Sequence, residues 1–261
     1  MGRLMKYDLR AALRLFVPLW SGILLLALIN GFTVKLEFTD NRLLNFLTVL
    51  LIVLYVLAIF GIMLMTVIYV IQRFYQSMMR DEGYLTFTLP VSIDSILWSK
   101  ALTALILGIG SAAVCVVSFF LLVVRDLQNV EFRWLIDNLA TNVTWQQTLG
   151  LLVCLAVAVL ATGLATLFQV YLAMALGQLA QKNRVALSIA AFVGISVAMS
   201  FLATLPLPWI EDLASLELRL IDDSMLAASV IFLSVAVASL AQCVIYYLPA
   251  RYLFRKKLNL E

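Results

Sequence analysis

Six long apolar runs are the feature that most constrains what this chain can fold into. They lie between charged clusters and cover residues 15–34, 43–72, 97–124, 147–174, 186–205 and 225–248. Each run supplies the roughly 20 residues that an α-helix needs to cross a bilayer, and none shows the alternation of a barrel strand. With 64% hydrophobic and 13% charged residues, the chain is too apolar for a soluble domain. The sequence therefore predicts an all-α, polytopic membrane protein with six transmembrane helices in a single domain, 1–261.

The basic residues predict the orientation. Thirteen of the 18 lysines and arginines lie on the side that six crossings give to both termini, and five lie on the other side. Short cytoplasmic loops of membrane proteins carry such an excess of positive charge. We therefore expect a multi-pass protein of the plasma membrane with both termini and residues 73–98 in the cytoplasm, and with residues 125–146 and 206–224 outside. The net charge of +3 gives no indication of a nucleic-acid partner.

The segment before the first run is amphipathic. Basic residues share one helical face, namely Arg3, Lys6, Arg10 and Arg14. Apolar residues share the other, namely Leu4, Met5, Leu9, Ala12, Leu13 and Phe16. This pattern predicts an N-terminal helix lying in the cytoplasmic membrane interface. Pro18 and Trp20 would then mark the turn into the bilayer. The alternative is an ordinary basic flank of the first span.

The loop between the second and third runs is the most informative for function. As a helix, the second run would be about 43 Å long against about 30 Å of hydrocarbon, so it tilts or projects into the cytoplasm. Beyond Arg73 the helix can continue, Gly83 offers a break, and Pro90 forbids further helix. Ser92 can cap the next helix, with Asp94 favourably placed near its N-terminus. We expect a short cytoplasmic helix with apolar side chains, typical of a surface that docks another protein; the alternative is a solvated connection.

The sequence lacks the residues that several kinds of catalytic, nucleotide-binding and metal-binding sites require. The chain has no histidine, which excludes Ser-His-Asp and H-E-x-x-H sites, and it has no phosphate-binding loop of the G-x-x-x-x-G-K-[ST] type. Three scattered cysteines do not form a metal cluster. We therefore expect no catalytic, cofactor or metal site. No run carries a central charged residue, which disfavours an ion-coupled carrier. The milder polar groups in the runs are expected mainly to bond their own or a neighbouring helix backbone.

The fifth run carries a stripe of small residues. They recur at intervals of four, as Ala186, Ala190, Gly194 and Ala198. Small side chains let two helices approach closely. The stripe is therefore expected to lie at a helix–helix contact, either within this chain or with a second subunit.

The loop carries a resemblance to a known family. Its sequence runs Asp81-Glu82-Gly83-Tyr84-Leu85-Thr86-Phe87-Thr88-Leu89-Pro90-Val91-Ser92 and continues with Ile96-Leu97-Trp98-Ser99-Lys100. Together with the basic N-terminus and the six runs, it resembles the membrane permeases of bacterial type-two (exporter-like) ABC transporters. As topology the likeness covers the whole chain, but residue matching is confined to about 74–100.

The resemblance implies an assembly of two permeases and two separate ATPase subunits. In such permeases the loop is the coupling helix that seats in a groove of the ATPase. Residues in the matching positions become candidates for the ATPase contact, namely Tyr75, Met78, Met79, Asp81, Glu82, Gly83, Tyr84 and Leu85. The family also places the first and fifth spans against the partner permease, identical or homologous. That makes Ala190, Gly194 and Ala198 candidates for a permease–permease contact.

Three functions fit the sequence. The first is the permease of an ATP-driven transporter that exports a peptide, a lipid or an amphipathic drug. The second is a self-contained channel or carrier, which needs a polar pathway that the runs show only weakly. The third is a non-transporting membrane scaffold or sensor subunit. The substrate is not contained in the resemblance, and membrane lipids are expected partners in every case.

Overall fold

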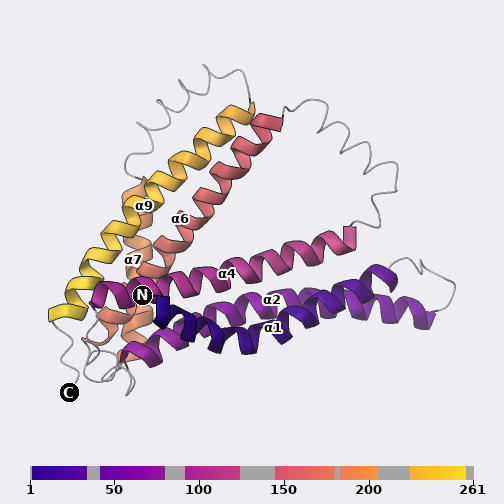
Figure 1. The fold of residues 1–261 in the computed structure, drawn as a ribbon, viewed down its shortest axis with the longest axis horizontal. Helices are drawn as coiled ribbons and strands as arrows, with labels where there is room; N and C mark the ends of the chain where they lie inside the picture. Colours follow the sequence, from indigo (N-terminus) through magenta and orange to yellow (C-terminus); the bar gives the residue numbers. More distant parts are fainter. Residues whose placement is uncertain are drawn as a thin grey trace. The chain divides into compact units, whose positions relative to one another are not determined.

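The computed structural model describes residues 2–33, 42–79, 92–123, 145–179, 183–204 and 224–256. Within these ranges the chain forms six α-helices and no strand (Figure 1): α1 (Gly2–Thr33), α2 (Arg42–Met79), α4 (Ile93–Val123), α6 (Trp145–Gly177), α7 (Arg184–Thr204) and α9 (Ser224–Lys256). Each of the six helices is long and apolar enough to cross a membrane. The predicted all-α fold with six candidate transmembrane helices is therefore confirmed.

Several helices extend beyond the apolar runs that predicted them. The first candidate span is Met5–Thr33 and the last is Met225–Arg255, so both continue through basic residues at one end. Lysine and arginine are good helix formers, and a change in hydropathy alone does not end a helix. Helix α2 likewise continues past Arg73 to Met79, as the sequence predicted.

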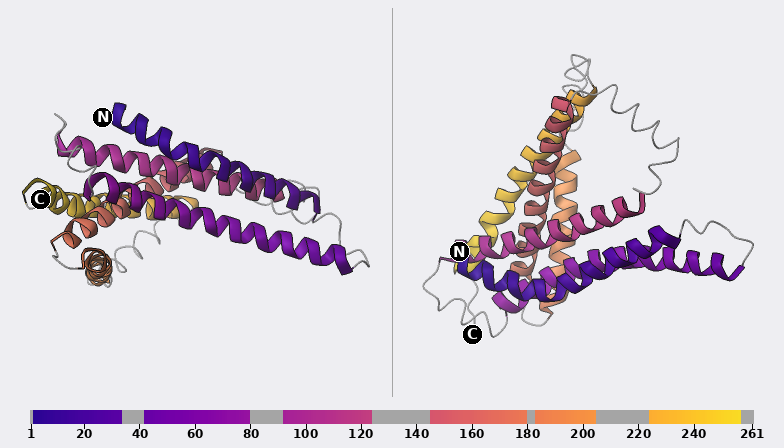
Figure 2. Two further views of the ribbon diagram at one scale, coloured as in Figure 1. Left: turned by 90° about the horizontal axis from the view of Figure 1, so that it is seen from below. Right: turned by 45° about the vertical axis from the view of Figure 1, so that its right-hand side comes forward.

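The expected turn at Pro18 is wrong. Helix α1 runs without a break from Gly2 to Thr33 with Pro18 inside it, and it is curved along its length (Figures 1 and 2). A proline within a helix removes one backbone hydrogen bond, here to the carbonyl of Arg14, and can bend a helix without ending it. The basic segment is thus helical as expected but continuous with the first span. Its place in the membrane interface stays a prediction.

The chain divides into two compact units. The first comprises Met1–Arg73 and Trp98–Asn142, and the second comprises Phe74–Leu97 and Val143–Glu261. Helices α2 and α4 therefore each contribute residues to both units. Because the division does not cut the chain into two successive segments, the single domain expected from the sequence stays a prediction.

In the first unit, α1 lies beside α2 and α4 (Figures 1 and 2). The Trp20 indole of α1 lies so close to α4 that a Cβ atom on Gly110 would be 2.7 Å from the ring. The indole Nε1 donates a hydrogen bond of 3.2 Å to Ser111 Oγ, which is 2.9 Å from Thr66 Oγ1 of α2. Buried Phe16 packs with Leu107 in the same region. Side-chain polar groups and close packing thus join all three helices.

In the second unit, α6 packs against both α9 and α7. Alanines dominate the contact with α9, where Ala158 and Ala161 cluster with Ala236. Small side chains let these helices approach closely without help from the hydrophobic effect, which is weak between helices in lipid. Hydroxyls of α6 and α9 meet 3.0 Å apart, between Thr162 and Ser239. This contact joins two side chains, whereas Thr66, Ser118 and Ser196 each donate to a backbone carbonyl of their own helix, as expected from the sequence.

Candidate coupling region at the ends of α2 and α4

The candidate site consists of the two helix ends that flank residues 80–91, which lie outside the described residues. Helix α4 begins with the predicted cap: Ser92 Oγ accepts a hydrogen bond of 3.3 Å from the backbone N–H of Ser95. The two serine hydroxyls also lie 2.9 Å apart. This cap satisfies a backbone donor that the first helical turn would otherwise leave unpaired. It therefore fixes where α4 starts after Pro90.

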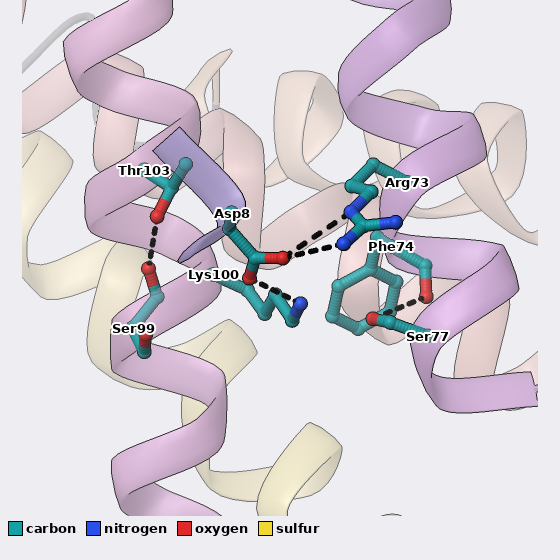
Figure 3. A network of polar contacts seen from close by, with 7 residues as sticks. All are labelled: Asp8, Arg73, Phe74, Ser77, Ser99, Lys100 and Thr103. Atoms are coloured by element: carbon teal, nitrogen blue, oxygen red, sulfur yellow. Dashed lines mark hydrogen bonds and ion pairs between the residues drawn. The ribbon is translucent and has the colours of Figure 1, made fainter. Parts of the chain in front are cut away.

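In the first unit, one carboxylate joins three helices. Asp8 of α1 lies between Arg73 of α2 and Lys100 of α4 (Figure 3). Arg73 donates to Asp8 Oδ1 from Nη2 at 2.8 Å and from Nε at 3.2 Å. The Lys100 ammonium donates to Asp8 Oδ2. Within the first unit, Arg73 of α2 and Lys100 of α4 are therefore both tied to α1.

The burial of these groups decides what the cluster contributes. Asp8 is 6% exposed and Lys100 is 9% exposed, whereas the Arg73 side chain is one-third exposed at 33%. A buried charge is tolerated only when it is paired, because removing it from water costs several kcal/mol. The Asp8–Lys100 pair is thus mutually dependent, while the Arg73 contact is partly screened by its surroundings. Within the first unit, the cluster fixes the positions of Arg73 and Lys100 relative to α1.

In the second unit, a second carboxylate joins α4 to α9. Asp94, in the first turn of α4, pairs with Arg251 at 2.8 Å and accepts a 2.5 Å hydrogen bond from the Tyr247 hydroxyl. Its carboxylate also lies where a helix N-terminus favours negative charge. The Asp94 and Arg251 side chains are 34% and 42% exposed, so this contact is weaker than a buried pair. It orients the start of α4 against α9.

Aromatic rings hold the last part of α2 in the same unit. Phe74 stacks on Tyr171 of α6 with ring centroids 3.7 Å apart and an angle of 7° between the planes. Phe254 of α9 meets the Phe74 ring edge-on, with centroids 6.0 Å apart. Phe168 contacts both Tyr171 and Tyr247 through further edge-on packing. The segment of α2 that leads to residue 80 is therefore packed against α6 and α9.

The predicted ATPase-contact residues divide into two groups. Tyr75, Met78 and Met79 lie in the last turns of α2. Met78 is buried with 1% exposure and Tyr75 is partly buried, so the Met78 side chain faces the chain's own interior. The remaining candidates lie outside the described residues, namely Asp81, Glu82, Gly83, Tyr84 and Leu85.

The small-residue stripe of α7 is exposed among the described residues of the second unit. Ala190, Gly194 and Ala198 are all exposed, and a Cβ atom on Gly194 would meet nothing within 4 Å. The opposite side of α7 makes the contact with α6, where Gln169 Nε2 donates to Ser196 Oγ at 2.7 Å. The stripe is thus not used for packing among the described residues of this chain. Its candidate permease–permease contact remains available.

Sequence reasoning missed the charged clusters at both helix ends. A signal for the first was present, because Asp8 precedes Ala12 and Phe16 by four and eight residues and thus shares their apolar face. An acid on such a face requires a buried partner, but the sequence does not show which of many cations supplies it. Comparisons of the chain with protein-family models, with curated proteins and with solved structures found no match.

Proposed function

We propose that this chain is the permease subunit of an ATP-driven ABC transporter. It catalyses no reaction itself and is powered by a separate ATPase subunit. It exports a peptide, a lipid or an amphipathic drug. The observation that best supports the proposal is that both helices leading into residues 80–91 are held by their neighbours. Arg73 and Phe74 hold the end of α2, and Asp94 and Lys100 hold the start of α4.

Helix ends that are held in this way can transmit a displacement of residues 80–91 to the membrane helices. If the helix ends were loosely packed, a displacement of residues 80–91 would be absorbed by fraying of α2 and α4. With the ends held, a displacement is passed on within each unit, to α1 through Asp8 in the first and to α9 through Asp94 in the second. A mechanical element of this kind requires an external energy source, because the sequence has no nucleotide-binding motif.

The residues between the helices carry the proposed contact. Tyr84 and Leu85 supply the apolar anchor, and Asp81 and Glu82 meet basic groups of the ATPase. Gly83 allows the backbone to turn sharply, and Pro90 ends the segment rigidly. Closure of two ATPase subunits on ATP would then move the segment and, through it, the membrane helices.

A second permease completes the proposed assembly. The exposed stripe of α7, with Gly194 at its centre, offers a surface on which another helix can approach closely. The partner is an identical or a homologous permease. Lipids cover the remaining apolar surface of the helices.

The proposal is tested by purifying the tagged chain from its native membrane and measuring bound ATPase subunits and ATP hydrolysis. We expect an ATPase to co-purify with the wild-type chain. The double variant Glu82→Lys with Leu85→Asp should lose the ATPase, or should hydrolyse ATP without transport, while still inserting into the membrane. Loss of the partner is expected because the variant removes both an acid and an apolar anchor from the contact.

The matched control makes the same two kinds of substitution in the segment that is predicted to lie outside the cell. Glu217→Lys with Leu220→Asp repeats the two substitutions at the same spacing of three residues. It should keep the ATPase. If the wild-type chain never binds an ATPase, the scaffold or channel alternatives take the place of the permease. If the Glu82 and Leu85 variant binds and couples normally, residues 80–91 are not the coupling element.

A further inference from the structure

A groove on α1 has the composition of a lipid site. The groove is shallow and largely open, it is lined by residues of α1 alone, and it offers about 550 Å³ of space to a ligand. Lys6, Arg10 and Arg14 line it, together with the apolar side chains of Leu13, Val17 and Pro18. Leu13, which the sequence pattern placed on the opposite face, thus lies beside the basic residues. The lining is therefore mostly apolar with basic groups among it. We propose that this groove binds an anionic glycerophospholipid of the adjoining leaflet.

The length of α1 places the groove at the right depth. The helix has 32 residues and is thus about 48 Å long, against about 30 Å of hydrocarbon. In a helix that crosses along the membrane normal, about 18 Å, or roughly twelve residues, extends beyond the hydrocarbon. The apolar sequence up to Thr33 puts this excess at the basic end, which includes Lys6 and Arg10. Arg14 then lies near the hydrocarbon boundary, where lipid phosphates are found.

The spacing of the cations suits a phosphodiester. Lys6, Arg10 and Arg14 follow one another at intervals of four, which separates neighbours by about 6 Å along the helix. Two neighbouring cations can therefore contact one phosphate from both sides, and guanidinium groups bind phosphate oxygens in pairs. All three residues are exposed. Long side chains of this kind also rest their methylene stems on apolar surface while the charge stays at the headgroup level.

The charges in the groove have no partner among the residues that the structure describes. These residues include two carboxylates, of Asp8 and Asp94. Asp8 is buried and pairs with Arg73 and Lys100, and Asp94 pairs with Arg251. With respect to the described residues, the groove thus presents uncompensated positive charge. Leu13 and Val17 favour a lipid over an acidic peptide, because they add a surface for acyl chains that continues towards the hydrocarbon.

The test uses the full chain purified in a mild detergent. Dioctanoyl phosphatidylglycerol and dioctanoyl phosphatidylcholine are titrated separately, and the dissociation constants are measured by native mass spectrometry. Replacing Lys6, Arg10 and Arg14 by Gln should weaken phosphatidylglycerol binding by about 100-fold, given the usual contribution of each basic residue at an anionic surface. Binding of phosphatidylcholine should be unchanged. Val17→Asn should weaken both lipids, because it interrupts the apolar floor.

The control removes the same charge elsewhere on the predicted cytoplasmic side, by replacing Lys182, Arg184 and Arg255 with Gln. It should bind phosphatidylglycerol within about twofold of the wild type, since none of these residues lines the groove. Equal loss in the control would overturn the site in favour of general charge attraction. Unchanged binding by the groove variant, or by Val17→Asn, would also overturn it. So would full displacement of the lipid by an equal concentration of glycerol 3-phosphate, which would indicate a site for free phosphate.

Discussion

The Asp8–Lys100 pair gives the sharpest prediction about stability. Asp8→Asn removes the carboxylate that the Lys100 ammonium contacts, while Lys100 remains 9% exposed. A buried charge that loses its partner destabilises a protein by about 3–5 kcal/mol. Arg73 adds less, about 1 kcal/mol or below, because its guanidinium is one-third exposed. We therefore expect Asp8→Asn to lower the free energy of unfolding by about 3–5 kcal/mol.

A double-mutant cycle separates the pair from its surroundings. Lys100→Met leaves Asp8 paired with Arg73 and removes the ammonium. In that background Asp8→Asn should lower the free energy of unfolding by only about 1 kcal/mol, since no buried cation is left without a partner. The coupling energy between Asp8 and Lys100 is then about 2–4 kcal/mol. The measurement is unfolding of the full chain by SDS in mixed micelles, followed by circular dichroism.

The control is Asp94→Asn, whose carboxylate is about as exposed as the Arg73 side chain. It should cost clearly less than Asp8→Asn, because water and headgroups can solvate the remaining Arg251. A coupling energy below about 0.5 kcal/mol between Asp8 and Lys100 would refute the reasoning, because independent sites are additive to that limit.

Two further substitutions test the helix contacts. Gly110→Val places a Cβ atom 2.7 Å from the Trp20 indole ring and should destabilise the chain by about 1–3 kcal/mol in the SDS unfolding assay. Its control, Gly108→Val, would meet nothing within 4 Å of the added Cβ atom and should be neutral or stabilising. Equal effects of the two variants would contradict the close packing of α1 on α4. Gly194→Leu should weaken permease association by about tenfold in a cross-linking assay, with insertion intact, because an added side chain separates the helices. Ser200→Leu, at an exposed position on another side of α7, should leave association unchanged. Unaltered association in both variants would remove the stripe from the interface.

The sequence was sufficient for the parts of the fold that depend on local properties. Hydropathy located all six helices, and the cap at Ser92 followed from its position after Pro90. The turn expected at Pro18 failed because a proline costs a helix one hydrogen bond, and the continuous packing of α1 can outweigh that cost. Hydropathy and capping act within a few residues along the chain or normal to the bilayer, whereas the packing of α1 involves residues far apart in the sequence.

The candidate site depends on contacts that no local pattern specifies. Asp8 reaches partners 65 and 92 residues away, and the Asp94 carboxylate reaches Tyr247 across 153 residues. Many lysines and arginines lie on the same predicted side of the membrane, so charge alone does not choose among them. The partner is selected by which helices pack together, and in lipid that selection depends on side-chain shape more than on hydropathy.

The stack of Phe74 on Tyr171 has a consequence for how the protein is made. The two residues are separated by about 100 residues, which a ribosome adds in about 5–20 s at common rates of synthesis. During that interval the second unit lacks α6 and α9, so Phe74 has not yet met the aromatic rings on which it packs. Asp8, in contrast, can close its ion pairs as soon as Lys100 has emerged. Biogenesis would therefore pass through a stage in which the first three helices are already joined by charge while the end of α2 still depends on the insertion machinery for cover.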